Sequence, residues 1–583
     1  MLGENEIDEA NDSKVREETC SHETEDDASD DGDSVSDDGN TFSSNPVTSV
    51  NDNEIASDVE KARDALAKLI CFEEMPPLAT TKFLHELNPK LEVGFHTVEA
   101  DCLEIYEEER EKIKEVLRDF DGQISLSVEI SWYEKRYCVF YDYMCLRAHF
   151  IDDSWNLKNW VLNFRHIRHP FEVQGATLES LKGWDVENKI STLTMVNPDD
   201  YDETFEVVKD HIQSKKELQL NGQLFCVYCC GDFISLMVQD AFNEIREIID
   251  TVSELYSFGK SLPLWYLTNS RLKDALELES MGEFSSKDVT DHYKVPSADE
   301  WNKVRGICKL VDSIYEVANA LFETKHITSN VYLHHLQELQ AILTQESSNS
   351  DSFIRTVVEK MQQKFDKYWK DMFLVLTIAT VMDPRYKMKY IEFSSSKFEG
   401  SDGNSQVRVL EAIHSLYDDY VTRFSGKGNS TSSTQEEYSP SHIEEGCCNS
   451  TVVFSDLQEY QQFIQCTSPP PRSDLDWYLK EPVLPWSQDF NALSWWRAAS
   501  PKYPILSRMA RDFLAIPISL ATSFEAFYTQ KREADRRIIS LKPALMNALM
   551  CTRSWYKSTE NSNGVWTSFW WSSYIFLDIK LNL

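Results

Sequence analysis

Basic residues are the first shortage in this sequence. The chain of 583 residues has 58 Lys and Arg against 97 Asp and Glu, so its formal net charge is −39. Proteins that coat nucleic acid bind phosphate through concentrated Lys and Arg. The composition therefore excludes a generally basic nucleic-acid-coating protein and leaves room only for a local basic groove.

Long apolar runs are also missing. The opening MLGENEIDEA has neither a basic nor an apolar segment, so we expect no signal peptide. The one dense aromatic run, VWTSFWWSSYIFL at 565–577, is shorter than the ~20 residues that a membrane span needs. The 13 cysteines are scattered, without the paired spacing of a small secreted scaffold. We therefore expect an intracellular protein with no membrane segment.

The acidic residues that are present gather at the N-terminus. Residues 1–60 contain 20 acidic and 2 basic side chains, interleaved with Ser, Gly and Asn. Such a segment has too little apolar surface to offset the conformational entropy lost on folding. We predict a disordered acidic tail over 1–57, followed by a folded chain whose apolar content is ample for a sizeable core.

Apolar periodicity divides the next part of the chain. Residues 58–122 have helical spacing and predict a helical N-terminal region. In 123–130 (QISLSVEI) apolar and polar residues alternate, which predicts a strand with Glu129 on its polar face. Strands then alternate with helices up to residue 257, the predicted strands covering 138–151, 159–167, 190–196 and 224–229 and the predicted helices 175–185 and 200–214. This pattern predicts a mixed α/β core over 123–257.

The second half is mainly helical. Residues 233–257 predict one long amphipathic helix, and most of 298–390 is helical within a region spanning 258–424. A Ser-, Thr- and Gly-rich stretch predicts a flexible linker over 425–472. Strong apolar patterning returns over 473–557, whereas 558–583 is an atypical tail without amphipathic order.

Several strings in this order carry a family resemblance. They are ADCLEIYEEEREKIKEVL (100–117), AHFIDDSWNLKNWVLNFRHI (148–167), LNGQLFCVYCC (220–230), VMDPRYKM (381–388) and the segment 474–519. Together they resemble plant hAT-superfamily transposases of the domesticated Ricesleeper/Daysleeper type. The resemblance implies an α/β plus α architecture: an RNase H-like mixed sheet, interrupted by a helical insertion and completed by a helical C-terminal dimerisation region.

Active members of that family cut DNA with three carboxylates that hold two Mg²⁺ ions. Paired hard cations need such oxygen ligands to stabilise the attacking and leaving oxygens. The first carboxylate corresponds to Glu129, where Asp is expected; the longer side chain either still binds metal or is simply a strand residue. The second corresponds to Val196 and the third to Phe524, beside Glu525. Unless the alignment slips by one residue at Glu525, two ligands are lost, and we predict an inactive enzyme without cofactor.

Zinc-binding motifs also depart from the family pattern. Members continue Cys-Cys-Ala-His where this chain has Cys229–Cys230–Gly231–Asp232, three residues after Cys226. A structural zinc site needs four ligands, usually in two close pairs, and no second pair is apparent near these residues in the sequence. We therefore interpret them as buried cysteines. The BED zinc finger of active relatives is absent as well, because only Cys20 and His22 precede residue 60.

Two candidate interaction sites lie near the C-terminus. Large aromatic and apolar side chains are typical interface anchors, although they equally suit a core. The predicted dimerisation residues are Trp495, Trp496, Tyr503, Ile505, Leu506, Met509, Leu514, Ile516 and Pro517. The candidate DNA contacts, which a solvated helix face would explain equally well, are Lys531, Arg532, Arg536 and Arg537.

The resemblance and the lost carboxylates together predict a transposase-derived, catalytically inactive nuclear protein. It would form a homodimer, or a heterodimer with related hAT-type proteins, and DNA is a further candidate partner. The alternative is an active hAT transposase that performs Mg²⁺-dependent cleavage and strand transfer. A decaying relic without a selected role is a third hypothesis.

Overall fold

The computed structural model describes most of the chain between residues 52 and 560. The described ranges are 52–72, 77–87, 94–135, 139–169, 171–195, 198–255, 265–322, 328–398, 404–425, 473–487, 489–520, 532–533 and 541–560. The chain divides into two compact units, 1–56 and 57–583, and the fold below is that of the second unit. Most of the predicted acidic tail, the linker and nearly all of the atypical tail lie outside the described residues.

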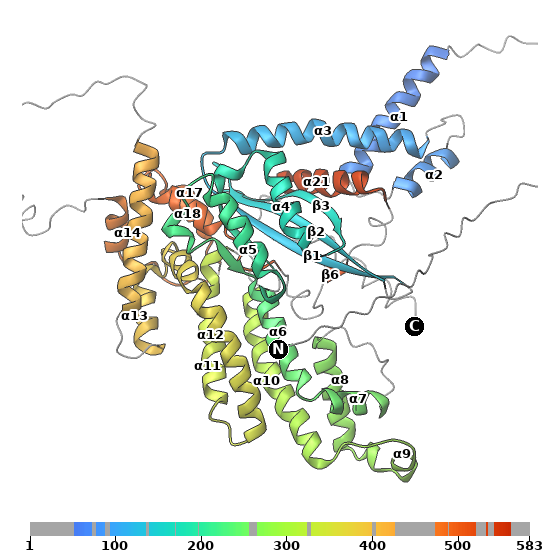
Figure 1. Ribbon diagram of the computed structural model, residues 1–583, viewed down its shortest axis with the longest axis vertical. Coiled ribbons are helices and arrows are strands. Elements are labelled where there is room, and N and C mark those ends of the chain that lie inside the picture. The colour runs from blue at the N-terminus through green and yellow to red at the C-terminus, as the bar shows by residue number, and fades with distance from the viewer. Residues whose placement is uncertain are drawn as a thin grey trace, which may run out of the picture. The chain divides into compact units, whose positions relative to one another are not determined.

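A mixed sheet forms the first half of the folded unit (Figure 1). Its strand order is β3-β2-β1-β4-β5, with β2 antiparallel to β1 and β3, and β4 parallel to β1 and β5. A short sixth strand pairs with β1 beyond the end of its pairing with β4. The strands are β1 (Ile124–Lys135), β2 (Val139–Ile151), β3 (Leu157–Ile167), β4 (Ile190–Met195), β5 (Cys226–Tyr228) and β6 (Arg532–Glu533). This order confirms the predicted mixed α/β core.

Alternation along β1 places two sets of side chains on opposite faces of the sheet. Ile124, Leu126 and Val128 are buried in an apolar cluster, as the sequence predicts. The opposite face is also covered, because Ser125 and Ser127 are 1% and 0% exposed. The polar face is therefore an internal polar layer rather than a solvated surface.

Helices from both ends of the described chain pack together beside this sheet. The first helices are α1 (Asp52–Phe72), α2 (Pro77–Leu87) and α3 (Phe95–Asp119), and α4 (Phe171–Trp184) and α5 (Pro198–Gln213) connect β3 to β4 and β4 to β5. The last described helix, α21 (Pro543–Glu560), lies along β3 and α3 (Figure 1). These helices confirm the helical N-terminal region predicted from periodicity.

Helix α21 seals the outer edge of β3. An edge strand presents unpaired backbone groups that invite pairing with another chain. Here Asn547 Oδ1 accepts from the Phe164 amide at 2.9 Å, and Ser554 Oγ accepts from the Val161 amide at 2.8 Å. The indole of Trp555 donates to the Val161 carbonyl at 2.9 Å. Side chains of a helix thus take the place of a neighbouring strand.

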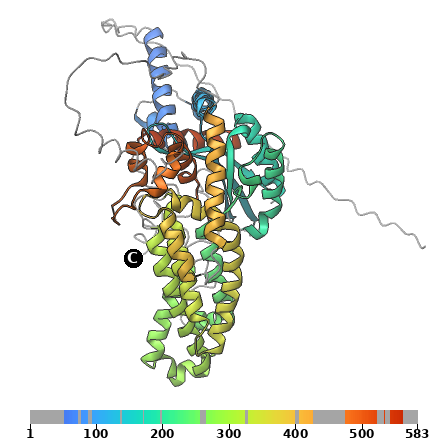
Figure 2. The same cartoon turned by 90° about the vertical axis from the view of Figure 1, so that its left-hand side faces the viewer.

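The insertion is a set of long helices that pack side by side (Figure 2). Its members are α6 (Cys230–Asn243), α7 (Arg246–Leu255), α8 (Trp265–Ser280), α9 (Lys287–His292), α10 (Ala298–Phe322), α11 (Tyr332–Glu346), α12 (Ser352–Val381), α13 (Lys387–Phe398) and α14 (Asn404–Ser425). The prediction of a single helix over 233–257 is wrong, because the helix is interrupted between α6 and α7. The Ile245 amide there bonds the Phe242 carbonyl at 3.1 Å, a tight turn that ends the helical ladder. No helix in these described ranges is long and apolar enough to cross a membrane.

The C-terminal region returns to the start of β1 through a buried polar network. This region contains α16 (Asp474–Lys480), α17 (Ala492–Ala499) and α18 (Leu506–Leu514). Asp512 of α18 accepts hydrogen bonds from the Gln123 amide at 3.0 Å and from the Tyr420 hydroxyl at 2.6 Å. Gly122 is required there, because a Cβ atom would lie 2.8 Å from the Asp512 carboxylate. Burial raises the pKa of Asp512 to about 6.

That raised pKa predicts how the stability depends on pH. A carboxyl whose folded pKa exceeds its unfolded value stabilises the fold fully below the unfolded pKa and loses this contribution as pH rises through the folded pKa. For Asp512 the window runs from about pH 4 to about pH 6. We measure the free energy of unfolding in urea and take the difference between Asp512→Asn and wild type. We expect this difference to shift in favour of Asp512→Asn by about 3 kcal/mol between pH 4 and pH 7. Asp64→Asn, on an exposed part of α1, is the control. A difference that stays flat with pH for Asp512→Asn would contradict the assignment.

Candidate functional site

The candidate site centres on Glu129, in the middle of β1. Its register partner on β2 is Cys145, and Arg147 stands two residues further along that strand, opposite Ser127. Arg147 Nε lies 3.2 Å from Glu129 Oε1, and the two side chains are only 15% and 12% exposed. Arg147 also donates to Asn159 Oδ1 on β3 at 3.3 Å. The carboxylate of Glu129 is therefore part of an ion pair held within three adjacent strands.

Uncharged polar side chains surround this pair on the same face. Ser127 Oγ lies 2.7 Å from His149 Nε2, and both residues are fully buried. Burial, with a smaller effect from Arg147, lowers the pKa of His149 to about 3, so the imidazole is neutral at physiological pH. Thr192 and Thr194 of β4 continue the polar layer beside Ser125 and Ser127. Within residues 124–130, 143–151 and 190–195, whose side chains the structure describes, the only Asp, Glu, Lys or Arg side chains are Glu129 and Arg147.

The other two metal-ligand positions cannot be placed. Val196 follows Met195, which pairs with Val128, but Val196 itself lies outside the described residues. Phe524 and its neighbour Glu525 lie outside them too. In the ranges that the structure does describe, no three His, Cys, Asp or Glu side chains converge in a way that could hold a metal ion. The loss of ligands at Val196 and Phe524 stays a prediction from sequence.

The cysteines after β5 lie at a packed junction. Cys229 and Cys230 are buried and Cys226 is half-buried. The Cys230 amide donates to the Ile518 carbonyl at 2.8 Å, and the Leu520 amide lies 3.3 Å from Cys229 Sγ. Burial raises the pKa of the Cys230 thiol far above its ordinary value, which keeps it protonated. A zinc ligand must be a thiolate, so this environment favours the interpretation as buried cysteines.

The predicted dimerisation residues are mostly inside the chain's own core. Trp495 and Ile505 are half-buried, whereas the buried members are Trp496, Tyr503, Leu506, Met509, Leu514, Ile516 and Pro517. Trp496 donates its indole N–H to the Met382 carbonyl at 2.8 Å and stacks on Trp155, with ring centroids 6.4 Å apart. These seven side chains pack the C-terminal region within one chain, and their role in dimerisation stays a prediction from sequence.

The VMDPRYKM string is the other half of this docking site. Asp383 is fully buried and binds Arg385 and Asn330, with Nη2 and Nδ2 at 2.7 and 2.6 Å. Lys387, whose φ is +49°, donates to the backbone carbonyls of Tyr478 and Glu481 at 2.6 and 3.0 Å. Partial burial lowers the pKa of Lys387 to about 8. The string therefore holds the C-terminal region against the end of α12.

The candidate DNA contacts are largely unplaced. Lys531, Arg536 and Arg537 lie outside the described residues. Arg532 belongs to β6, which pairs with β1 at Ser131, so a helix face does not account for this position. Sequence reasoning missed both β6 and Arg147. The hairpin register that pairs 125–131 with 143–149 was the one signal that could have placed Arg147 beside Glu129.

Comparison with protein families supports the RNase H-like architecture. Residues 330–420 match the hAT-like transposase, RNase-H fold; residues 474–556 match the hAT family C-terminal dimerisation region; and residues 138–224 match the ZBED1 RNase-like domain. The first match falls on the helical region, the third on β2 to β4 with α4 and α5, and the second on α16 to α21.

Individual relatives extend the similarity over most of the chain. It is 30% identical over 557 residues to Zinc finger BED domain-containing protein RICESLEEPER 2 of Oryza sativa subsp. japonica, covering 86% of this chain and 75% of the relative. It is 27% identical to Zinc finger BED domain-containing protein DAYSLEEPER of Arabidopsis thaliana, covering 87% and 75%. It is 26% identical to the Putative AC transposase of Zea mays, covering 81% and 62%. These matches confirm the predicted resemblance.

The ion pair at the site predicts a stability effect. Removing one partner of a nearly buried pair leaves the other charge desolvated, which costs several kcal/mol. We expect Glu129→Ala to lower the free energy of unfolding by about 2–4 kcal/mol in urea titrations. Glu179→Ala, which breaks the exposed pair with Arg165, should cost under about 1 kcal/mol. A double variant that adds Arg147→Met to Glu129→Ala should recover part of the lost stability. Equal losses of stability in Glu129→Ala and Glu179→Ala would refute the buried pair.

Proposed function

Since this chain belongs to the hAT transposase family, we propose that it is a transposase-derived protein that no longer cleaves DNA and that acts in the nucleus through self-association. The observation that carries the loss of cleavage is the ion pair between Glu129 and Arg147. The dimerisation region matched at 474–556 supports self-association. Nuclear action is the expectation for a protein derived from a DNA-cutting enzyme.

The ion pair opposes metal binding for an electrostatic reason. Two-metal cleavage needs carboxylate oxygens directed at divalent cations, and each cation repels a nearby positive charge. At this position a guanidinium, 3.2 Å from the carboxylate, already neutralises Glu129. Aliphatic and aromatic side chains at Val196 and Phe524 would supply no further ligand. The residues present here do not fit a pair of Mg²⁺ ions.

An assay of strand cleavage tests this proposal against the alternative of an active transposase. We expect the full chain to release no nicked or cut product from supercoiled plasmid or from short duplexes, in either Mg²⁺ or Mn²⁺. Cleavage that depends on the metal and disappears in Glu129→Gln would overturn the proposal and favour an active enzyme. Cleavage that persists in Glu129→Gln would indicate a contaminating nuclease, which is why the variant is purified in parallel.

DNA binding is the less supported part of the proposed function, because the chain is strongly acidic. Any affinity would come from the basic cluster between residues 531 and 537. Binding through phosphate releases counterions, so the logarithm of the binding constant falls with the logarithm of salt by about 0.9 for each phosphate contacted.

We expect that neutralising this cluster weakens DNA binding and makes the binding constant depend less steeply on salt concentration, as measured by fluorescence anisotropy. The slope should fall by about 2–4 for a variant in which Gln replaces all four of Lys531, Arg532, Arg536 and Arg537. The control removes the same charge from exposed helix positions, with Gln at Lys68, Lys112, Arg118 and Lys389. Equal slopes in the two variants would show that the cluster does not contact DNA, and no binding at low salt would remove DNA from the proposed function.

A further inference from the structure

We propose that an aromatic ridge, formed by the exposed Trp486 and Phe393 and the half-buried Tyr386 and Tyr390, is the surface through which two copies of this chain associate. The inference rests on the proposed function, because it names the surface that performs the self-association. It replaces the buried side chains of α17 and α18 with residues that a second molecule can reach.

The starting observation is what remains exposed in the matched dimerisation region. Its aromatic side chains in α17 and α18 pack in or against the chain's own core, since Trp496 is 0% exposed and Trp495 is half-buried against the same cluster. Among the described residues of 474–556, the large apolar side chains that stay exposed are Trp477, Val483 and Trp486. Trp486 is the most exposed of these, at 69%. Large exposed aromatics are the side chains that supply most interface energy when covered.

Trp486 does not stand alone, because its segment is fixed against the start of α13. The Leu484 amide donates to the Pro384 carbonyl at 2.9 Å, and Arg385 donates to the Ser487 carbonyl at 3.1 Å. These two bonds hold the segment that carries Trp486 beside Pro384 and Arg385, the residues that precede Tyr386. The exposed tryptophan thus lies beside the start of an aromatic row.

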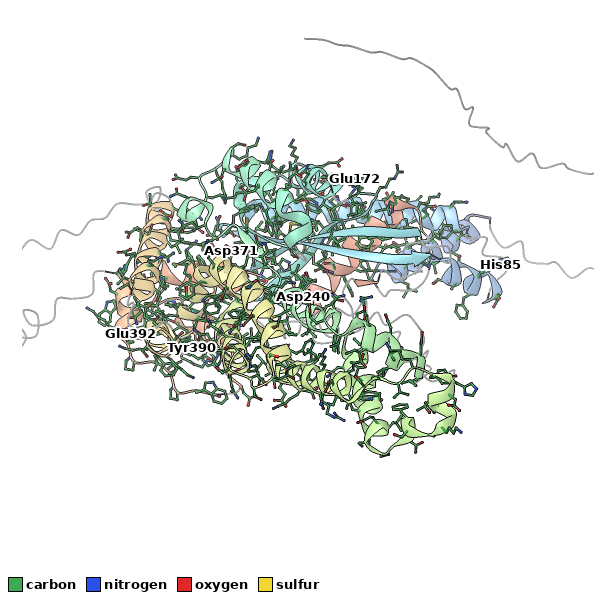
Figure 3. The ribbon with its side chains drawn as sticks, turned by 60° about the horizontal axis from the view of Figure 1, so that its bottom comes forward. His85, Glu172, Asp240, Asp371, Tyr390 and Glu392 are labelled. Atoms are coloured by element: carbon green, nitrogen blue, oxygen red, sulfur yellow. The ribbon has the colours of Figure 1, made fainter. Side chains whose placement is uncertain are left out.

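The row continues from Tyr386, the residue before α13, into that helix. Tyr390 and Phe393 are three residues apart on α13, which places them about one turn apart. The ring centroids are 5.2 Å apart for Tyr386 and Tyr390 and 6.2 Å apart for Tyr390 and Phe393, and Phe393 is 57% exposed. Figure 3 shows Tyr390 and Glu392 on this helix, at the periphery of the described chain. Two regions about 90 residues apart in sequence therefore build one surface.

The ridge is held in place before any partner arrives. Pro482 and Pro485 restrict the backbone around the exposed Val483 and Trp486. Tyr390 donates its hydroxyl hydrogen to Gln337 Oε1 of α11 at 2.9 Å, which fixes the middle of the row. Side chains that are already ordered lose little conformational entropy on binding. This pre-ordering favours the ridge as a contact surface over a mobile apolar patch.

Charge identifies a second copy as the occupant. The chain carries −39 overall, so two copies repel one another unless the contacting surfaces are locally neutral. The charges beside the ridge balance: Lys389 pairs with Glu392 at 2.7 Å, and Lys397 lies 6.0 Å from the Phe393 ring. The negative charge of Glu338, which is felt electrostatically at Tyr386 and Tyr390, offsets the positive charge of Lys397. In a two-fold dimer the same patch of each copy meets its counterpart. An aromatic row with no local net charge can make this contact without electrostatic repulsion.

The experiment compares two double variants of the full chain by sedimentation equilibrium over a concentration series. We expect Trp486→Ala with Phe393→Ala to raise the dimer dissociation constant at least tenfold. The matched control is Phe171→Ala with Tyr293→Ala, which removes two aromatics that are 64% and 52% exposed on other parts of the fold. Its dissociation constant should equal that of wild type. Thermal unfolding of both variants checks that neither substitution unfolds the chain.

The outcomes separate this inference from the proposed function. A wild-type chain that stays monomeric at all concentrations overturns self-association itself, and the ridge with it. A wild-type dimer that is unaffected by the ridge variant overturns the ridge alone and leaves the proposed function standing. Hydrogen exchange adds a direct readout: residues 384–394 and 482–487 should be protected at high concentration and exchange faster on dilution. Protection confined to other segments would likewise overturn the ridge.

Discussion

The docking of the C-terminal helices onto strands nearly 400 residues earlier in the chain is the constraint on which the rest of the structure depends. Asp512 reaches the Gln123 amide across 389 residues, and Trp555 reaches the Val161 carbonyl across 394. Closing so long a loop costs chain entropy, although the cost grows only slowly with length. Buried hydrogen bonds and packed aromatics offset it, because each polar group would otherwise be left desolvated. The helical insertion between the two ends is thereby enclosed in one fold.

This docking decides which residues remain available for function. Trp496 and Tyr503 must fill the junction with α12, so they cannot also face a partner without opening it. Among the aromatic side chains that stay exposed is Trp486, whose segment is hydrogen-bonded to Pro384 and Arg385 at the rim of the junction. On the sheet, the same closure keeps the layer around Ser127 away from water. Within that layer Arg147 gives Glu129 a structural partner, which accounts for a carboxylate at this position through the fold alone.

Periodicity predicted the parts of the fold that depend on local pattern. The alternation in 123–130 predicted β1, and the helical spacing before residue 120 predicted α3. The prediction from periodicity was wrong at 233–257, because a tight turn at Ile245 interrupts the helix and no Pro or Gly near that position indicates a turn. It placed Ser125 and Ser127 on the polar face of β1 but could not show that this face is buried, since a single strand does not reveal what covers it. Matching the carboxylate motifs located Glu129 but could not show what it binds.

The family, the RNase H-like architecture and the strong acidity follow from residue order and composition alone. The pairing of Glu129 and the burial of Trp496 follow only from the folded chain. The pairing depends on the register of β1 against β2, and the burial depends on how α17 meets the end of α12. Both are contacts between distant segments, and the free energy of such contacts is set by packing and desolvation that no local pattern encodes.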